Sequence, residues 1–131
     1  MLVFAVLARA PMALAAEVDA RVLLDDAPVA DLTFHAVADG PLGAVDVPRP
    51  GRPSLRFAFT TARPNATQVT FEVRISEVTV DRRGREKATL VSTPRITAMV
   101  GEDATVLQGE RVPVDGAYVE RTTEITLVYR E

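Results

Sequence analysis

Strict alternation of apolar and polar residues over residues 69–76 is the feature that most constrains the fold. The apolar positions are Val69, Phe71, Val73 and Ile75, with polar residues between them. Successive side chains of a β-strand point to opposite faces, so this pattern predicts a strand with one packed and one solvated face. At Glu77 the phase changes, because Val78 and Val80 are apolar at even positions. We expect a β-bulge or a sharp bend there.

The same alternation recurs along the chain, and turn residues separate its segments. Further strands are predicted over residues 18–24, 29–38, 55–59 and 124–130. Asp25-Asp26, the segment 81–85 and Asp115-Gly116 supply the turns. The spacing predicts an all-β fold, a small antiparallel sandwich or open barrel of about seven short strands.

The stretch Leu90–Val114 is predicted to form a strand, a tight turn and a returning strand. Pro94 lies within the first strand and has no N–H to give to a ladder, so that strand is expected at a sheet edge or at a bulge. Gly101 begins the polar turn, because glycine readily adopts positive φ. Gly109 is expected to break the returning strand, which then leaves through Val112-Pro113-Val114.

A proline- and glycine-rich segment spans residues 39–54, where seven of sixteen residues are Gly or Pro. Such a segment cannot be a central strand, because proline donates no ladder hydrogen bond. We expect a loop, either a flexible crossover between two β units or a binding loop.

The first sixteen residues are apolar and rich in alanine, and Ala13-Leu14-Ala15 matches a signal peptidase site. The segment is therefore predicted to be a signal peptide, and residues 17–131 a single β domain. The alternative is a buried first strand or helix.

Composition limits the classes of function. The chain of 131 residues is 47% apolar, so it can bury a core, but it lacks cysteine and cannot form a disulfide or a thiolate metal site. Its net charge of −3 argues against nucleic acid as a partner. No metal, phosphate or nucleophile motif is present, and the single histidine, His35, is given no role. We therefore expect no catalytic residues and no cofactor.

One concentration of charge stands out, at the predicted turn after residue 80. It consists of Arg82, Arg83, Arg85 and Lys87. A solvated hairpin tip is the simple interpretation. Contact with anionic lipid or with an acidic protein surface is the other.

Residues 69–114 resemble the secretins, the outer-membrane channel proteins of type II and type III secretion and of type IV pili. The similarity lies in Ile75-Ser76-Glu77-Val78, in Leu90-Val91-Ser92-Thr93-Pro94-Arg95, and in Gly101, Ala104–Gly109 and Val112-Pro113. The positions that carry it are Glu77, Pro94, Arg95, Gly101, Gly109 and Pro113. A secretin has a long insertion where this chain has only residues 79–89. The resemblance thus implies a β scaffold and an envelope location, without a pore.

The expected function is binding or assembly in a bacterial envelope, in the periplasm or at the outer membrane, through a protein partner or self-association at an edge strand. The alternative is a free-standing periplasmic β-sandwich that binds a peptide or inhibits an enzyme through the segment 39–54. A truncated gene product is a third interpretation. Contact with a membrane is left open by the sequence.

Overall fold

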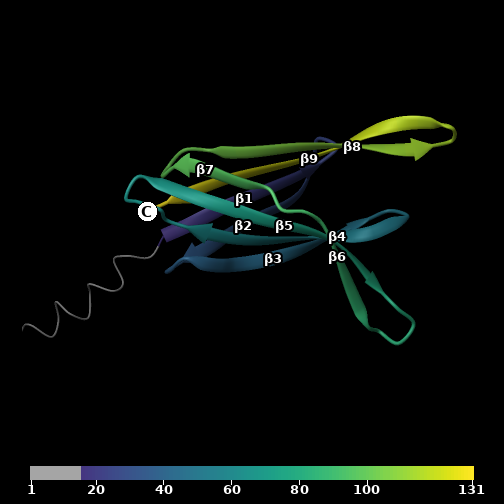
Figure 1. Cartoon of the computed structure of the whole chain (residues 1–131), viewed down its shortest axis with the longest axis horizontal. Coiled ribbons are helices and arrows are strands. Elements are labelled where there is room, and N and C mark those ends of the chain that lie inside the picture. Colours follow the sequence, from purple (N-terminus) through teal and green to yellow (C-terminus); the bar gives the residue numbers. More distant parts are fainter. Residues whose placement is uncertain (1–15) are drawn as a thin grey trace, which may run out of the picture.

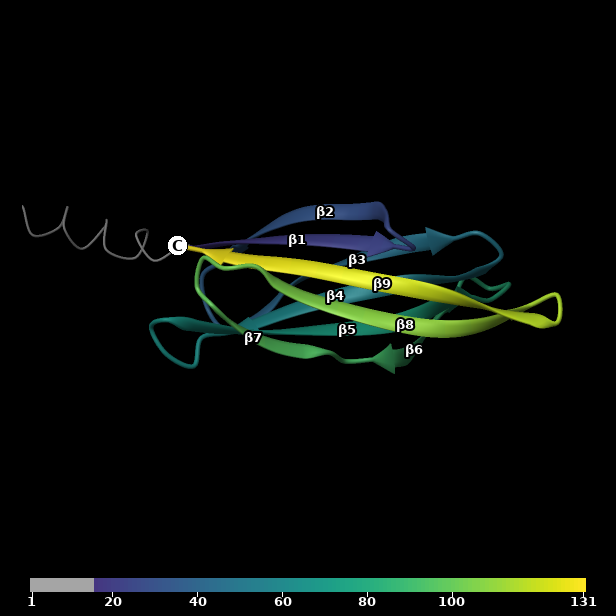
Figure 2. The same cartoon turned by 90° about the horizontal axis from the view of Figure 1, so that it is seen from above.

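The computed structural model describes residues 16–131, which form two antiparallel β-sheets packed face to face (Figures 1 and 2). Sheet A has four strands in the order β2-β1-β9-β8, and sheet B has the order β3-β4-β5-β6, with β7 also paired to β5. The strands are β1 (Ala16–Leu24), β2 (Ala27–Ala36), β3 (Gly40–Arg49), β4 (Arg52–Ala62), β5 (Gln68–Val80), β6 (Glu86–Ser92), β7 (Arg95–Met99), β8 (Ala104–Val114) and β9 (Ala117–Arg130). The all-β prediction is confirmed in its sandwich form. Among residues 16–131 no helix is long and apolar enough to cross a membrane.

The hydrophobic core lies between the sheets and follows the alternation in the sequence. Its largest contributions are Val18 and Val22 of β1, Phe57 and Phe59 of β4, Val69, Phe71, Val73 and Ile75 of β5, and Ile125, Leu127 and Tyr129 of β9. The predicted packed face of residues 69–75 is confirmed. Because aromatic side chains are few, close packing of branched aliphatic residues fills the space.

The proline-rich segment is the largest correction to the predicted elements. Most of residues 39–54 form β3 and the start of β4, with only a short turn between them. Pro41 and Pro48 are tolerated because β3 is the edge strand of sheet B. Pro53 lies in β4 just before Ser54, the first residue of β4 that pairs with β5. Register shifts fall between Pro41 and Gly43 and between Val47 and Arg49, so Leu42 and Pro48 lie in bulges. The segment is a distorted edge hairpin rather than a loop.

The stretch Leu90–Val114 does not form the predicted local hairpin. β7 pairs with β5 in sheet B, whereas β8 pairs with β9 in sheet A. The turn at Gly101 does form, with positive φ, but it carries the chain from one sheet to the other. The edge prediction is confirmed, because β6 and β7 both pair only with β5 and Pro94 interrupts them.

Two smaller predictions about strand continuity also need correction. β8 runs through Gly109 and Pro113 without a register shift, because β9 provides a continuous ladder along its length. The phase change at Glu77 corresponds to a register shift between Ile75 and Ser76 in the β5–β6 pairing. The extra residue is Val91 of β6, so the irregularity lies on the neighbouring strand.

The predicted turns are present where the sequence placed them. Asp25, Asp26 and Asp115 have positive φ, as two-residue hairpin turns require. In the turn after β5, the Asp81 carboxylate accepts hydrogen bonds from the backbone N–H groups of Arg83 and Arg85. The predicted signal peptide falls almost wholly on residues outside the described part of the chain. Its last residue, Ala16, begins β1 and is buried.

Candidate functional site

The hairpins β3–β4, β5–β6 and β8–β9 diverge at one end of the sandwich (Figure 1). A cleft lies at this end, lined by residues of both sheets. Its volume is about 870 Å³, within the range of sites that hold a small molecule or a peptide side chain. Apolar side chains from both sheets line it, among them Leu24, Val29, Leu55, Ile75 and Val91. The sheets no longer cover each other here, so the edge of the core is accessible from outside.

On the sheet B side, Arg49 fixes the β3–β4 hairpin against β5. Its Nη2 lies 2.8 Å from Oε2 of Glu77, and its Nε donates to the backbone oxygen of Pro53 at 2.7 Å. The Arg49 side chain is only 11% exposed and that of Glu77 35% exposed. This ion pair is therefore more protected from solvent than an ordinary surface pair.

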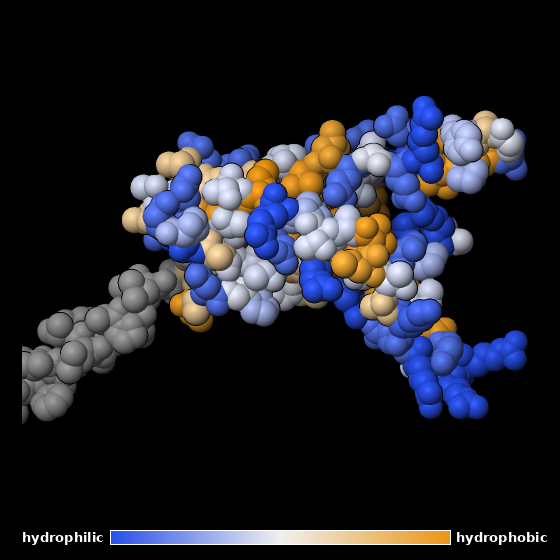
Figure 3. All heavy atoms as spheres, viewed as in Figure 1, coloured by the Kyte–Doolittle hydropathy of each residue, from blue (hydrophilic) through white to orange (hydrophobic). Residues whose placement is uncertain are grey.

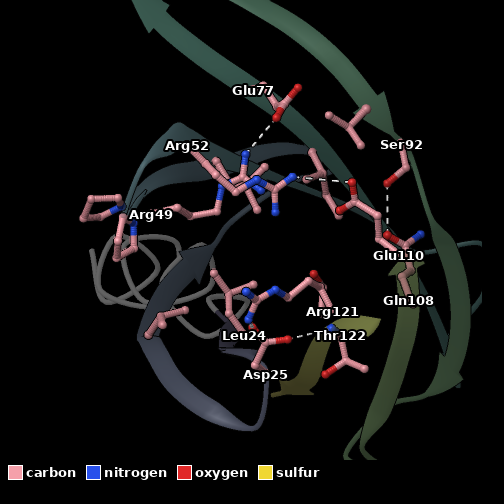
Figure 4. A pocket seen from close by; sticks show the side chains of 18 residues that line it. Leu24, Asp25, Arg49, Arg52, Glu77, Ser92, Gln108, Glu110, Arg121 and Thr122 are labelled. Atoms are coloured by element: carbon pink, nitrogen blue, oxygen red, sulfur yellow. Dashed lines mark hydrogen bonds and ion pairs between the residues drawn. The ribbon is translucent and has the colours of Figure 1, made fainter. Parts of the chain in front are cut away.

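On the sheet A side, Asp25 joins the β1–β2 turn to β9. Its carboxylate accepts a hydrogen bond from the backbone N–H of Thr122 at 2.9 Å and another from Arg121 at 3.0 Å. The Thr122 N–H, followed by Arg121, holds the pKa of Asp25 below its ordinary value of 3.8. Asp25 is thus ionised at neutral pH, and Figure 4 shows it beside Thr122 on this wall of the cleft.

Two further contacts connect walls that belong to different sheets. Arg52 lies 3.4 Å from Oε1 of Glu110, which links β4 to β8. Ser92 Oγ donates to Oε1 of Gln108 at 3.1 Å, which links β6 to β8 (Figure 4). The cleft therefore has an apolar interior and a rim of arginines, each paired with a carboxylate.

This arrangement suits binding by shape and by arginine hydrogen bonds. The three acidic side chains at the rim, Asp25, Glu77 and Glu110, each accept a hydrogen bond from an arginine. Among residues 16–131 no group of three or more His, Cys, Asp and Glu side chains is placed to hold a metal ion. The cleft can accept an extended chain that buries apolar groups and offers a carboxylate or carbonyl oxygens to the rim.

A second feature is the open edge of sheet B formed by β6 and β7. The backbone N–H of Val73 donates to Pro94 O, and that of Val100 donates to Thr67 O. Along an antiparallel ladder, residue pairs that exchange backbone hydrogen bonds alternate with pairs that do not. Counting from these two bonds, Ile96 and Ala98 direct their backbone N–H and C=O groups toward β5. The backbone N–H and C=O groups of Arg95, Thr97 and Met99 consequently face away from the sheet.

The residues singled out by the sequence do not form one site. Glu77 and Gly109 line the cleft, Pro94 and Arg95 lie on the open edge, Gly101 lies in the turn between the sheets, and Pro113 lies in the projecting part of the β8–β9 hairpin. Arg82, Arg83, Arg85 and Lys87 are exposed at or next to the β5–β6 turn. His35 is exposed on β2.

No pattern in the sequence marks the arginines of the rim. Arg49 and Arg52 lie in the segment predicted to be a loop, and Arg121 lies in a part of β9 that was not predicted as strand. Asp25 was interpreted only as a turn residue. Its contact with Thr122 spans 97 positions in sequence, and no local pattern reports such a contact.

Comparisons with known proteins found no matching family model, no similar curated protein and no similar solved structure. The resemblance of residues 69–114 to secretins therefore stays a prediction from sequence motifs.

Proposed function

We propose that this chain is an exported module of a bacterial envelope that acts by binding or assembly rather than by catalysis, with a secretin-like β core. The observation that carries the proposal is the open edge formed by β6 and β7, which pair only with β5. An edge with outward backbone donors and acceptors can take a strand from a partner or from a second copy. Arg95 on this edge is paired with Glu72 and remains exposed, which limits uncontrolled stacking.

Thr97→Pro tests the edge directly. The Thr97 N–H faces away from β5, so proline removes a donor of the open edge and leaves the ladder to β5 intact. We expect light scattering over a concentration series to show association of the native chain and a weaker association of the variant. Thr97→Ala is the matched control, because it also loses the hydroxyl contact with Thr70 at 2.9 Å but keeps the N–H.

Two results would overturn the assembly proposal. One is a mass of a single chain at every concentration. The other is equal association of the Thr97→Pro and Thr97→Ala variants. For the proposed export, intact-mass analysis of protein from the native host is expected to find a chain that begins at Ala16 or Glu17.

The second candidate is a periplasmic sandwich that binds a peptide or inhibits an enzyme. It is favoured by the contribution of Pro48, Arg49, Pro50 and Arg52 to the cleft, since all come from the proline-rich segment. Val29→Asp places a charge in the apolar lining at a partly exposed position and leaves the β6–β7 edge unchanged. If Val29→Asp loses peptide capture and keeps self-association, the cleft is the binding site. If the variant keeps peptide capture and loses self-association, the edge proposal is supported instead.

A further inference from the structure

Of the hairpins that diverge at the cleft end, β5–β6 and β8–β9 have tips that differ in chemistry (Figures 1 and 3). The basic tip consists of Arg82, Arg83, Arg85 and Lys87, around the turn between β5 and β6. The apolar tip consists of Val114, Tyr118 and Val119, around the turn between β8 and β9. Figure 3 shows strongly hydrophilic side chains on the first and hydrophobic side chains among those of the second.

The basic tip carries charge that the described residues do not neutralise. Ten ion-pair contacts occur within residues 16–131, and none involves these four cations. Of the two acids nearby, Asp81 accepts hydrogen bonds from the turn backbone and Glu86 pairs with Arg56. The tip is therefore an exposed positive patch on a chain whose net charge is −3.

The apolar tip is unusual for a hairpin in water, because apolar side chains occupy both of its faces. Residues paired across the hairpin share a face, and successive pairs alternate between faces. The pairs are Val112 with Val119, Pro113 with Tyr118, and Val114 with Ala117. Tyr118 is 72% exposed, and Val114 and Val119 are also exposed. A flat protein surface would cover one face only, whereas a lipid interface can surround both.

We propose that the two tips together dock this end of the sandwich on an anionic lipid bilayer. The basic tip meets the phosphate headgroups, and each cation near such a surface strengthens binding about fivefold. The apolar tip enters the interfacial region, where tyrosine is favoured because its ring is apolar and its hydroxyl is polar. Asp115 at the apex of this hairpin limits the depth of entry, since a carboxylate is disfavoured both by anionic headgroups and by hydrocarbon.

The first test measures cosedimentation of the full chain with vesicles of phosphatidylcholine, alone or with about one third phosphatidylglycerol. We expect binding only to the anionic vesicles, and weaker binding as salt is raised. Arg82→Glu with Arg83→Glu should reduce this binding at least about 25-fold, since two cations are lost. Arg21→Glu with Arg130→Glu is the matched control, because those arginines are exposed on sheet A away from the tips and should cause a much smaller loss.

The second test uses fluorescence, because the native chain contains no tryptophan. Tyr118→Trp places a single reporter in the apolar tip, and its emission should shift to shorter wavelength when anionic vesicles are added. Leu107→Trp is the control, since Leu107 is 67% exposed on β8, close to the exposure of Tyr118, but lies outside the tip. Asp115→Asn should tighten binding.

Three outcomes would overturn the proposal. The first is equal binding to vesicles with and without phosphatidylglycerol. The second is an emission shift at position 107 but not at position 118. The third is a pair of results: polyglutamate displaces the vesicles from the chain, and Tyr118→Ser leaves vesicle binding unchanged. This pair would assign the basic tip to an acidic protein partner. Thr97→Pro should leave vesicle binding unchanged, so failure of the edge proposal and of this one are distinguishable.

Discussion

The two ends of the sandwich use the same strands in different ways. At the end that carries the C-terminus, the turns are hydrogen-bonded to one another and to the strands. Val100 N–H donates to Thr67 O, Gly101 N–H donates to Tyr129 O, and Arg63 donates to Ala66 O. At the cleft end, the β3–β4, β5–β6 and β8–β9 hairpins diverge from one another, and β8–β9 extends furthest (Figures 1 and 2). We call these the closed end and the open end.

The difference is visible within a single strand. In β5, alternate residues are buried from Val69 to Ile75, while Val80 near the open end is 66% exposed. In β9, Ile125, Leu127 and Tyr129 are buried, whereas residues 117–121 are all exposed. Strand length beyond the core adds little hydrophobic stabilisation, because no second sheet covers it. The comparison suggests that the closed end maintains the fold and that the open end is available for interactions.

The largest expected effect comes from a pair of substitutions in β5. Ile75→Ala removes a buried side chain and should lower the free energy of unfolding by about 2 to 5 kcal/mol. Val80→Ala, on the same strand but exposed, should change it by less than about 0.5 kcal/mol. Urea denaturation measures both. Equal losses would mean that the open end is packed in solution and that the contrast between the ends is wrong.

A smaller effect is expected from the ion pair that anchors the β3–β4 hairpin. Glu77→Leu leaves the guanidinium of Arg49 nearly buried and without its carboxylate, which should cost about 1.5 to 3 kcal/mol. Asp46→Ala is the control, because the pair of Asp46 with Arg56 is more exposed and is worth about 0.2 to 1 kcal/mol. If both variants lose the same stability, the cleft wall is as solvated as the outer surface.

The smallest effect concerns Asp25, and it depends on pH. Because the folded state lowers its pKa below 3.8, this carboxylate stabilises the fold above that pH. The contribution is lost as the pH falls through the folded pKa. Asp25→Asn keeps a side chain that tolerates positive φ and should cost up to about 1 kcal/mol at neutral pH, because the group is partly exposed. The cost should disappear as the pH falls through the folded pKa, because the Asp25 carboxyl is then as uncharged as the amide that replaces it. A cost independent of pH would assign the effect to the turn instead of the charge.

Local sequence determined the elements whose conformation depends on near neighbours. Alternation identified the buried faces of residues 18–24, 69–75 and 125–129, because the side-chain period of a strand is fixed by the backbone. Asp25-Asp26 and Asp115-Gly116 identified turns, because few residues adopt positive φ at low cost. Pro94 identified a sheet edge, because it lacks a donor.

Only the tertiary structure decided which strands are neighbours. The chain from β7 to β8 resembles a hairpin in sequence, yet the two strands pair in different sheets. The segment 39–54 resembles a loop, yet β4 provides a ladder that tolerates its prolines at an edge. Arg49 with Glu77 and Asp25 with Thr122 meet across 28 and 97 positions. A ladder hydrogen bond or an ion pair depends on a partner brought close by the packing of both sheets, and the residues adjacent in sequence carry no information about that partner.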